Sequence, residues 1–193
     1  MRRKKDEITD KLEIERILTE CTVGRLATIG KDGYPYITPL NYVYWHGSIY
    51  FHCARTGEKL DNIAANSKIC FEVDSPLAYI DTDFAPEEPP CEVSQLYKSV
   101  VIRGRGEVVD DQDEKVAALN CLMASHERVA EFCGITAETP AVKLCTVVAV
   151  RIESITAKAN IGQKKTEAQK EKMREYLSKR DLPGDSEAVA QIK

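Results

Sequence analysis

Two alternating apolar segments that meet at a tight turn constrain the fold of this chain more than any other feature. Residues 34–44 read YPYITPLNYVY, residues 48–53 read SIYFHC, and Trp45-His46-Gly47 lies between them. Alternation with a period of two, interrupted by a turn that contains glycine, is typical of a β-hairpin. Because proline cannot donate to a hydrogen-bond ladder, Pro39 predicts a first strand in two pieces, at a sheet edge, a bulge or a strand end.

A loop of small residues connects this hairpin to a predicted helix. Residues 53–57 read CARTG, and the helix predicted over 58–65 carries Lys59 in its first turn. A helix N-terminus has unpaired N–H groups and a positive dipole end, and both favour a phosphate. Lys59 can add a charge-assisted hydrogen bond, although it can equally be an ordinary solvated lysine. The segment predicts a site for a phosphorylated cofactor against a sheet.

The rest of the chain predicts further strands with helices between them. The strands follow one another too closely for repeated βαβ units, so we expect a mainly β fold, a mostly antiparallel barrel with flanking helices. The proline-rich, acidic stretch 74–94 predicts a long surface loop. Further expected elements are helices over 11–21, from the Asp110-Asp111 cap onward, and over 125–133, and strands over 23–30, 69–73, 99–109 and 144–155.

Composition predicts one main domain, over 1–160, and a polar tail over 161–193. The tail is rich in Lys, Glu and Gln and has few large apolar residues, so we expect a solvated helix and a frayed end after Pro183-Gly184. A formal net charge of −4 gives no general attraction to nucleic acid or to anionic membranes. No apolar segment approaches the ~20 residues of a membrane helix, and no secretory signal is visible, so a cytoplasmic protein is expected.

The cysteines and histidines do not form metal or disulfide patterns. The seven cysteines are odd in number and none forms a CxxC pair, which favours small buried hydrophobic residues in a reducing compartment. The three histidines, His46, His52 and His126, are isolated from one another, so no metal site is expected. His46 in its turn and His126 on a polar helix are interpreted as surface residues.

Three segments together resemble a known family. They are GYPYITPLNYVYWHGSIYFHCARTGEKLDNIAANSKICFEVD over 33–74, YKSVVIRGRGEVVDDQDEKVAAL over 97–119 and VAVRIESITAK over 148–158. In this order they resemble the flavin-binding split-barrel family of pyridoxamine 5′-phosphate oxidase, and within it the branch of the nitroimidazole-resistance proteins. The resemblance covers residues 8 to 160.

The resemblance implies FMN held in a cleft of a homodimer, with both subunits lining it. Residues 37–40 would run beside the isoalloxazine ring, with Asn41 as a polar contact near it. Residues 52–54 would lie near the ribityl-phosphate arm, Lys59 would meet the phosphate, and two residues of the second subunit would approach the ring edge. The implied cofactor-binding residues are Ile37, Thr38, Pro39, Leu40, Asn41, His52, Cys53, Ala54, Lys59, Lys98 and Ser99.

The chain departs from the oxidase at positions that bind the vitamin phosphate. The oxidase has an Arg and a Lys along the second strand, where this chain has Tyr36 and Asn41. It also has an Arg-x-His signature near its C-terminus, whereas residues 157–193 contain no histidine. Oxidation of pyridoxine phosphate is therefore not expected.

The functional hypothesis is an oxidoreductase that passes electrons from reduced flavin to a small acceptor such as a nitroaromatic. His52 would be the catalytic proton donor, since imidazole titrates near neutral pH. Alternatively, His52 has a structural role only, as a hydrogen-bonded residue at a strand end. At the level of the whole protein, the alternatives are a flavin carrier or sensor without turnover and a split barrel that binds haem or a deazaflavin, so enzymatic activity stays open.

Overall fold

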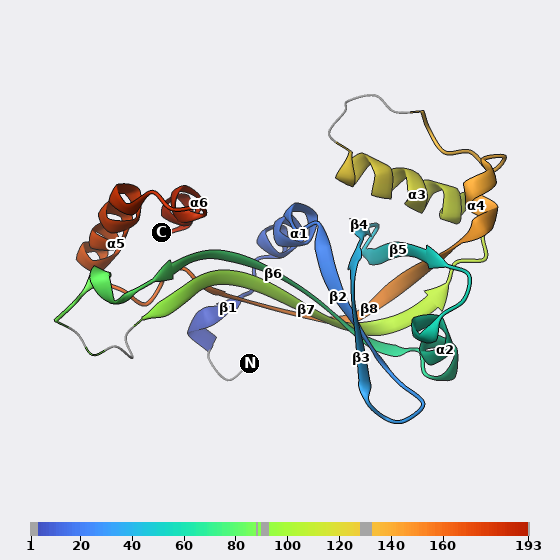
Figure 1. Cartoon of the computed structure of the whole chain (residues 1–193), viewed down its shortest axis with the longest axis horizontal. Helices are drawn as coiled ribbons and strands as arrows, with labels where there is room; N and C mark the ends of the chain where they lie inside the picture. The colour runs from blue at the N-terminus through green and yellow to red at the C-terminus, as the bar shows by residue number, and fades with distance from the viewer. Residues whose placement is uncertain (1–3, 88, 90–92, 128–132, 193) are drawn as a thin grey trace. The chain divides into compact units, whose positions relative to one another are not determined.

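The computed structural model describes residues 4–87, 89, 93–127 and 133–192. The chain forms two compact units, one from the described residues of 1–14, 74–100 and 156–193, the other from 15–73 and 101–155. The strands are β1 (Glu7–Ile8), β2 (Val23–Ile29), β3 (Pro35–Asn41), β4 (Val43–Trp45), β5 (Ser48–Ala54), β6 (Lys68–Ile80), β7 (Ser94–Val108) and β8 (Cys145–Asn160) (Figure 1). The helices are α1 (Lys11–Glu20), α2 (Glu58–Ala65), α3 (Gln112–His126), α4 (Pro140–Leu144), α5 (Glu167–Arg180) and α6 (Asp185–Gln191), with 3-10 turns at Lys4–Asp6 and Thr82–Phe84.

The expected mainly antiparallel sheet with flanking helices is confirmed. The strand order is β3-β2-β6-β7-β8-β5-β4, and β1 pairs with β8. β2 pairs antiparallel with β3 from Val23 opposite Asn41 to Ile29 opposite Pro35, and β5 pairs antiparallel with β8. This arrangement leaves β3 as a terminal strand of the sheet, so the backbone groups along its outer edge have no neighbouring strand.

The hairpin turn is confirmed, but the strand break lies elsewhere than expected. His46 and Gly47 have φ values of 46° and 73°, the left-handed pair that closes a two-residue hairpin between β4 and β5. Pro39 sits inside β3 opposite Arg25, so its placement on an edge strand is correct. The break comes at Tyr42, because its buried ring turns inward and its hydroxyl donates to the Leu18 carbonyl at 2.7 Å.

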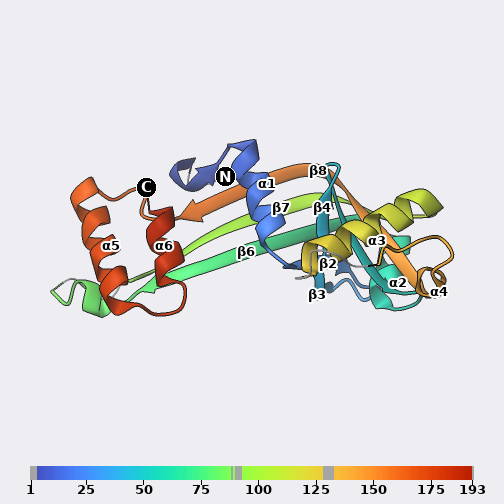
Figure 2. The ribbon, with the colours of Figure 1, turned by 90° about the horizontal axis from the view of Figure 1, so that it is seen from above.

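α3 lies along β4 and β5 in the unit formed by 15–73 and 101–155 (Figures 1 and 2). It begins at the expected aspartates, since the Asp111 side chain accepts from the Glu114 backbone N–H at 2.7 Å. The helix ends at His126, and most of the second helix expected over 125–133 lies outside the described residues. The apolar cluster under α3 contains Tyr50, Val109, Ala118, Leu119, Val142, Val147 and Ala149.

The long surface loop expected over 74–94 starts later than expected and ends where expected. β6 continues to Ile80 and β7 begins at Ser94. The strand persists through Pro76 because the side chains of Leu77, Ala78 and Ile80 are buried in an apolar cluster. Burial of apolar surface therefore outweighs the local preference of proline for a loop.

The solvated helix and frayed end expected for the tail are also wrong. Met173 and Leu177, one helical turn apart on α5, are 2% and 0% exposed, and residues 185–191 form α6 instead of fraying. α5 and α6 lie side by side (Figure 2) and pack on Leu77 and Leu96 of the same unit. A few apolar residues are therefore enough to bury one face of an otherwise polar helix. The domain boundary expected at residue 160 stays a prediction.

The cysteines are less buried than expected. The six that the structure describes form no disulfide; Cys133 is exposed and the other five are half-buried, while Cys91 lies outside the described residues. No helix within the described ranges is long and apolar enough to cross a membrane. The same residues contain no group of three His, Cys, Asp or Glu side chains arranged to hold a metal ion.

Candidate functional site

β3 presents the first group of expected cofactor residues with alternating exposure. Ile37, Pro39 and Asn41 are exposed, whereas Thr38 and Leu40 are half-buried on the other face. The Oγ1 atom of Thr38 is shielded from solvent and has no hydrogen-bond partner within the described part of the chain. A buried hydroxyl without a partner is unusual in a folded protein, so this atom is a candidate contact for a ligand.

The end of β5 brings Lys59 close to the second group. His52 and Ala54 are exposed and Cys53 is half-buried between them. Burial raises the pKa of the Cys53 thiol, and the positive charge of Lys59 acts against that rise. The ammonium group therefore lies near enough to the strand end to act electrostatically on it.

α2 is fixed to the sheet along its side and left open at its N-terminus. Its Asn62 side chain is 1% exposed and donates to Thr28 Oγ1 at 3.1 Å. Gly57 precedes the helix with φ at 141°, and no side chain of the described residues caps its first turn. The first N–H groups of this helix can therefore bind an anion, with Lys59 in the same turn.

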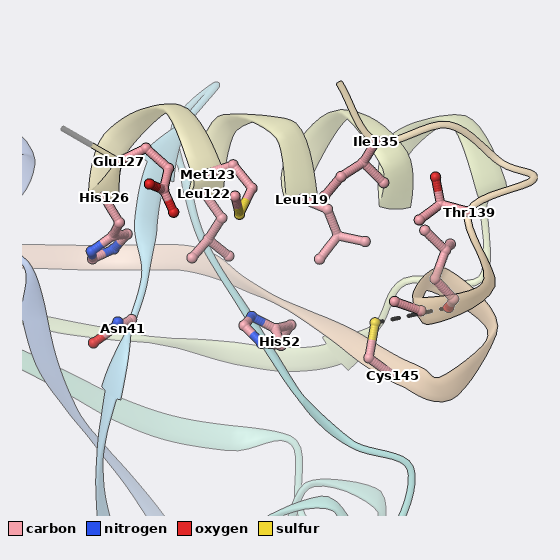
Figure 3. A pocket seen from close by; sticks show the side chains of 12 residues that line it. Asn41, His52, Leu119, Leu122, Met123, His126, Glu127, Ile135, Thr139 and Cys145 are labelled. Atoms are coloured by element: carbon pink, nitrogen blue, oxygen red, sulfur yellow. Dashed lines mark hydrogen bonds between the residues drawn. The ribbon is translucent and has the colours of Figure 1, made fainter. Parts of the chain in front are cut away.

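A pocket of about 420 Å³ lies between α3, α4 and the strands (Figure 3). It brings together two expected residues, Asn41 from β3 and His52 from β5. Leu119, Leu122 and Met123 of α3 point toward them from above (Figure 3). Its lining is Asn41, His52, Leu119, Leu122, Met123, His126, Glu127, Ile135, Thr139, Ala141, Val142 and Cys145. None of these lining residues, all within the described ranges, is a lysine or an arginine, so the pocket favours an uncharged apolar ligand over a phosphate.

α3 is held over this pocket at both of its ends. Near its start, Glu114 accepts from the Tyr50 hydroxyl at 2.7 Å and from Arg151 at 2.8 Å. These two hydrogen bonds, the Tyr50 bond first, lower the pKa of Glu114. At its end, His126 Nε2 lies 3.0 Å from the Tyr42 carbonyl oxygen, which can only accept, so this nitrogen carries the proton.

Lys98 and Ser99 belong to the other unit and are not among the residues that the pocket brings together. The Lys98 side chain is 6% exposed, and its Nζ donates to Glu13 Oε1 at 2.5 Å and to Gln191 Oε1 at 2.6 Å. Ser99 is 5% exposed, and its Oγ lacks a hydrogen-bond partner among the described residues. Of the two residues, Ser99 has the unsatisfied polar atom.

Sequence reasoning missed the α3 wall of the pocket. His126 was interpreted as a surface residue, but it is half-buried against Tyr42. Leu119, Leu122 and Met123 follow the Asp111 cap at helical spacing, which indicates an apolar helix face and no more. The sequence does place these apolar residues and His126 on one face of a helix. That pattern could have indicated a pocket wall, yet it is equally typical of a helix packed in the core.

The mainly antiparallel sheet, with β3 at one end of the strand order and a helix over the β4–β5 hairpin, defines a split-barrel protein. The match to the family model described as pyridoxamine 5′-phosphate oxidase covers residues 10–159. The chain belongs to this family.

Similar solved structures agree with this fold. A candidate 5-nitroimidazole antibiotic resistance protein from Bacteroides thetaiotaomicron is 25% identical, with a TM-score of 0.67 over 79% of this chain and 86% of that one. An FAD-binding protein from Mesorhizobium loti is also 25% identical, with a TM-score of 0.55 over 78% and 95%. An FAD- and haem-binding protein from Mycobacterium smegmatis, 18% identical over 80% and 73%, has a TM-score of 0.67 and shows the fold alone. No curated protein matched the sequence.

Proposed function

We propose that this protein binds FMN and passes electrons from the reduced flavin to a small uncharged acceptor such as a nitroaromatic. The observation that carries the proposal is the placement of Asn41 and His52 on one apolar pocket, with Lys59 in the first turn of α2, the helix that follows β5. Family membership and the similar structures described as flavin-binding support the choice of cofactor.

The residues present fit FMN. The open first turn of α2 and Lys59 would hold the phosphate, and the unpartnered Thr38 hydroxyl would contact a polar atom of the cofactor. When bound, a flavin supplies reversible redox chemistry of one or two electrons. Asn41, three residues after Thr38 on β3, would offer its side-chain amide to a polar atom of the cofactor.

The chain's own residues would supply the pocket and a proton. His52 lies on the pocket wall and would give its proton to the acceptor during reduction. The apolar side chains of α3 would exclude water around the acceptor. The absence of lysine and arginine from the lining, all of it described, argues against a phosphorylated substrate such as pyridoxamine phosphate.

A homodimer is part of the proposal. β3 and its neighbour β2 carry exposed apolar side chains, with Val23 45%, Ile29 43% and Ile37 62% exposed. By the strand register the three lie on one face of the β2–β3 pair, and exposed apolar side chains on one face are typical of an interaction site. A second copy would cover it and would bring its Ser99 to the cofactor, as the family resemblance implies.

Titration of the full-length chain with FMN tests cofactor binding. Lys59→Ala should weaken FMN affinity by ~1.5–3 kcal/mol, the usual contribution of a hydrogen bond to a charged group. Lys179→Ala, an equal charge change at an exposed position of α5, should leave affinity unchanged. A protein that takes up no FMN would contradict the proposal, and the visible spectrum of the purified protein would distinguish haem or a deazaflavin.

Turnover separates the oxidoreductase from a flavin carrier or sensor. The FMN-loaded protein is reduced with a nicotinamide donor or chemically, and reoxidation by nitrobenzene is followed in the absence of oxygen. His52→Ala should slow reoxidation by nitrobenzene while FMN affinity falls little. A bound flavin that no nitro compound reoxidises would favour the carrier or sensor.

A further inference from the structure

Asn120 connects two walls of the pocket although it does not line the pocket itself. It lies on α3, and its side-chain amide faces the backbone of Ile135. Nδ2 donates to the Ile135 carbonyl at 2.8 Å, and Oδ1 accepts from the Ile135 N–H at 2.8 Å. One side-chain amide thus satisfies both backbone groups of Ile135, as a neighbouring strand would.

This bridge sets the position of the chain segment that closes the pocket. Ile135 and Thr139 line the pocket opposite the sheet (Figure 3). Between them, the Thr136 N–H donates to Thr139 Oγ1 at 3.0 Å, and the segment runs directly into α4. Ile135 also packs on the apolar cluster under α3. Asn120 therefore supplies two of the hydrogen bonds that hold this turn against α3.

We propose that Asn120 is a positioning residue that sets the size of acceptor the pocket takes. The inference rests on the proposed function in taking this pocket as the acceptor site. The lining favours an uncharged aromatic ligand, because apolar side chains dominate it and no described lining residue is a lysine or an arginine. Asn120 acts through Ile135, so it sets the length of the pocket without contacting the ligand.

Loss of the Asn120–Ile135 hydrogen bonds should widen the pocket and leave its sheet-side wall intact. Asn120→Ala frees the Ile135 backbone groups to bind water, and the 135–139 wall can then retract. His52 and Asn41 on the sheet side keep their places. A two-ring ligand should therefore gain affinity relative to a one-ring ligand, which is a change in selectivity that general destabilisation does not produce.

The single tryptophan offers a direct binding readout. Trp45 packs on the same apolar cluster as Leu119 and Val142, two lining residues. Nitroaromatic compounds quench indole fluorescence, so the full-length protein can be titrated with nitrobenzene and with 1-nitronaphthalene. For Asn120→Ala we expect the ratio of the two dissociation constants to shift at least tenfold toward 1-nitronaphthalene. Ser125→Ala removes a hydrogen bond within the same helix, to the Leu122 carbonyl, and should leave the ratio unchanged.

Two further variants keep the inference testable if Asn120→Ala does not fold. Asn120→Asp keeps the acceptor for the Ile135 N–H and loses the donor, so it should shift the ratio in the same direction by a smaller factor. Ile135→Ala widens the same wall directly and should also favour the larger ligand.

The inference is overturned if Asn120→Ala changes both affinities equally, or if Ser125→Ala shifts the ratio as much. Wild-type protein that takes up FMN and binds neither nitro compound would also overturn it while leaving cofactor binding intact. Protein that takes up no FMN yet shows the selectivity shift would instead contradict the proposed function and support the role of Asn120.

Discussion

Arg180 donates two hydrogen bonds to the carboxylate of Asp185, from Nε to Oδ2 at 2.9 Å and from Nη2 to Oδ1 at 2.6 Å. The Asp185 residue is 1% exposed. The third guanidinium nitrogen, Nη1, donates to Asp81 Oδ2 at 2.6 Å. One arginine of α5 therefore joins the start of α6 to the residue that follows β6, within a single unit.

Arg180→Ala should destabilise this unit strongly. It leaves the buried Asp185 carboxylate without its cation, and breaking a buried pair in this way costs ~3–5 kcal/mol. Lys172→Ala on the same helix removes a 3.8 Å contact between two exposed side chains and should cost under ~1 kcal/mol. Urea unfolding followed by circular dichroism measures both; equal effects would contradict the structural role of Arg180.

Acid should weaken the same unit. A hydrogen bond from Arg180 lowers the pKa of Asp185, and one from Tyr176 lowers that of Asp81. A carboxyl whose folded pKa is depressed stabilises the fold above its unfolded pKa of ~4, and that stability is lost as the pH falls through the folded value. Unfolding free energy should therefore decline below about pH 4. In Asp185→Asn the decline should be shallower, and an unchanged slope would contradict this linkage.

Gly184→Ala should be more destabilising than Gly47→Ala. Both glycines have positive φ, at 90° and 73°. A Cβ at Gly184 would lie 2.4 Å from the Leu77 carbonyl oxygen, whereas a Cβ at Gly47 meets no described atom within 4 Å. Gly47→Ala should cost ~1–2 kcal/mol from backbone strain alone, and Gly184→Ala should cost more because a backbone clash adds to it. Thermal unfolding of the two variants compares their stabilities directly. Equal losses of stability would show that the β6 backbone moves enough to relieve the clash.

Ser99→Ala should separate stability from cofactor binding. The Ser99 hydroxyl has no partner in the described chain, so its removal should leave stability unchanged or slightly raised. If Ser99 contacts FMN across the dimer, affinity should fall in the FMN titration. Lys98→Ala is the contrast, because it breaks a buried ion pair with Glu13 and should cost about 3 kcal/mol of stability. Unchanged FMN affinity in Ser99→Ala would remove this residue from the site.

Local patterns predicted the elements that carry the strongest sequence signals. The Asp111 cap, the His46-Gly47 turn and the helix over 58–65 depend on neighbouring residues only, and all three are confirmed. The extension of β6 through Pro76 could not be read locally, because it depends on burial against α5 and α6, which follow about 90 residues later in the chain.

The site was predictable only in part, for the same reason. The resemblance implies Asn41 near the flavin ring and His52 near the ribityl-phosphate arm. Both line one pocket, and their contact with a cofactor stays a prediction. The pocket's upper wall comes from α3 and from Ile135, whose position depends on Asn120, a residue that no motif distinguishes. A side chain that acts on another segment's backbone leaves no periodic signal in the sequence.

The burial of Ile192 has a practical consequence for handling this protein. Its side chain is 4% exposed, and its carbonyl accepts from Arg174 at 3.1 Å. An affinity tag joined close to this packed position would disturb the cluster that it shares with Leu177 and Ala188, so a flexible linker should separate the two in every assay described above.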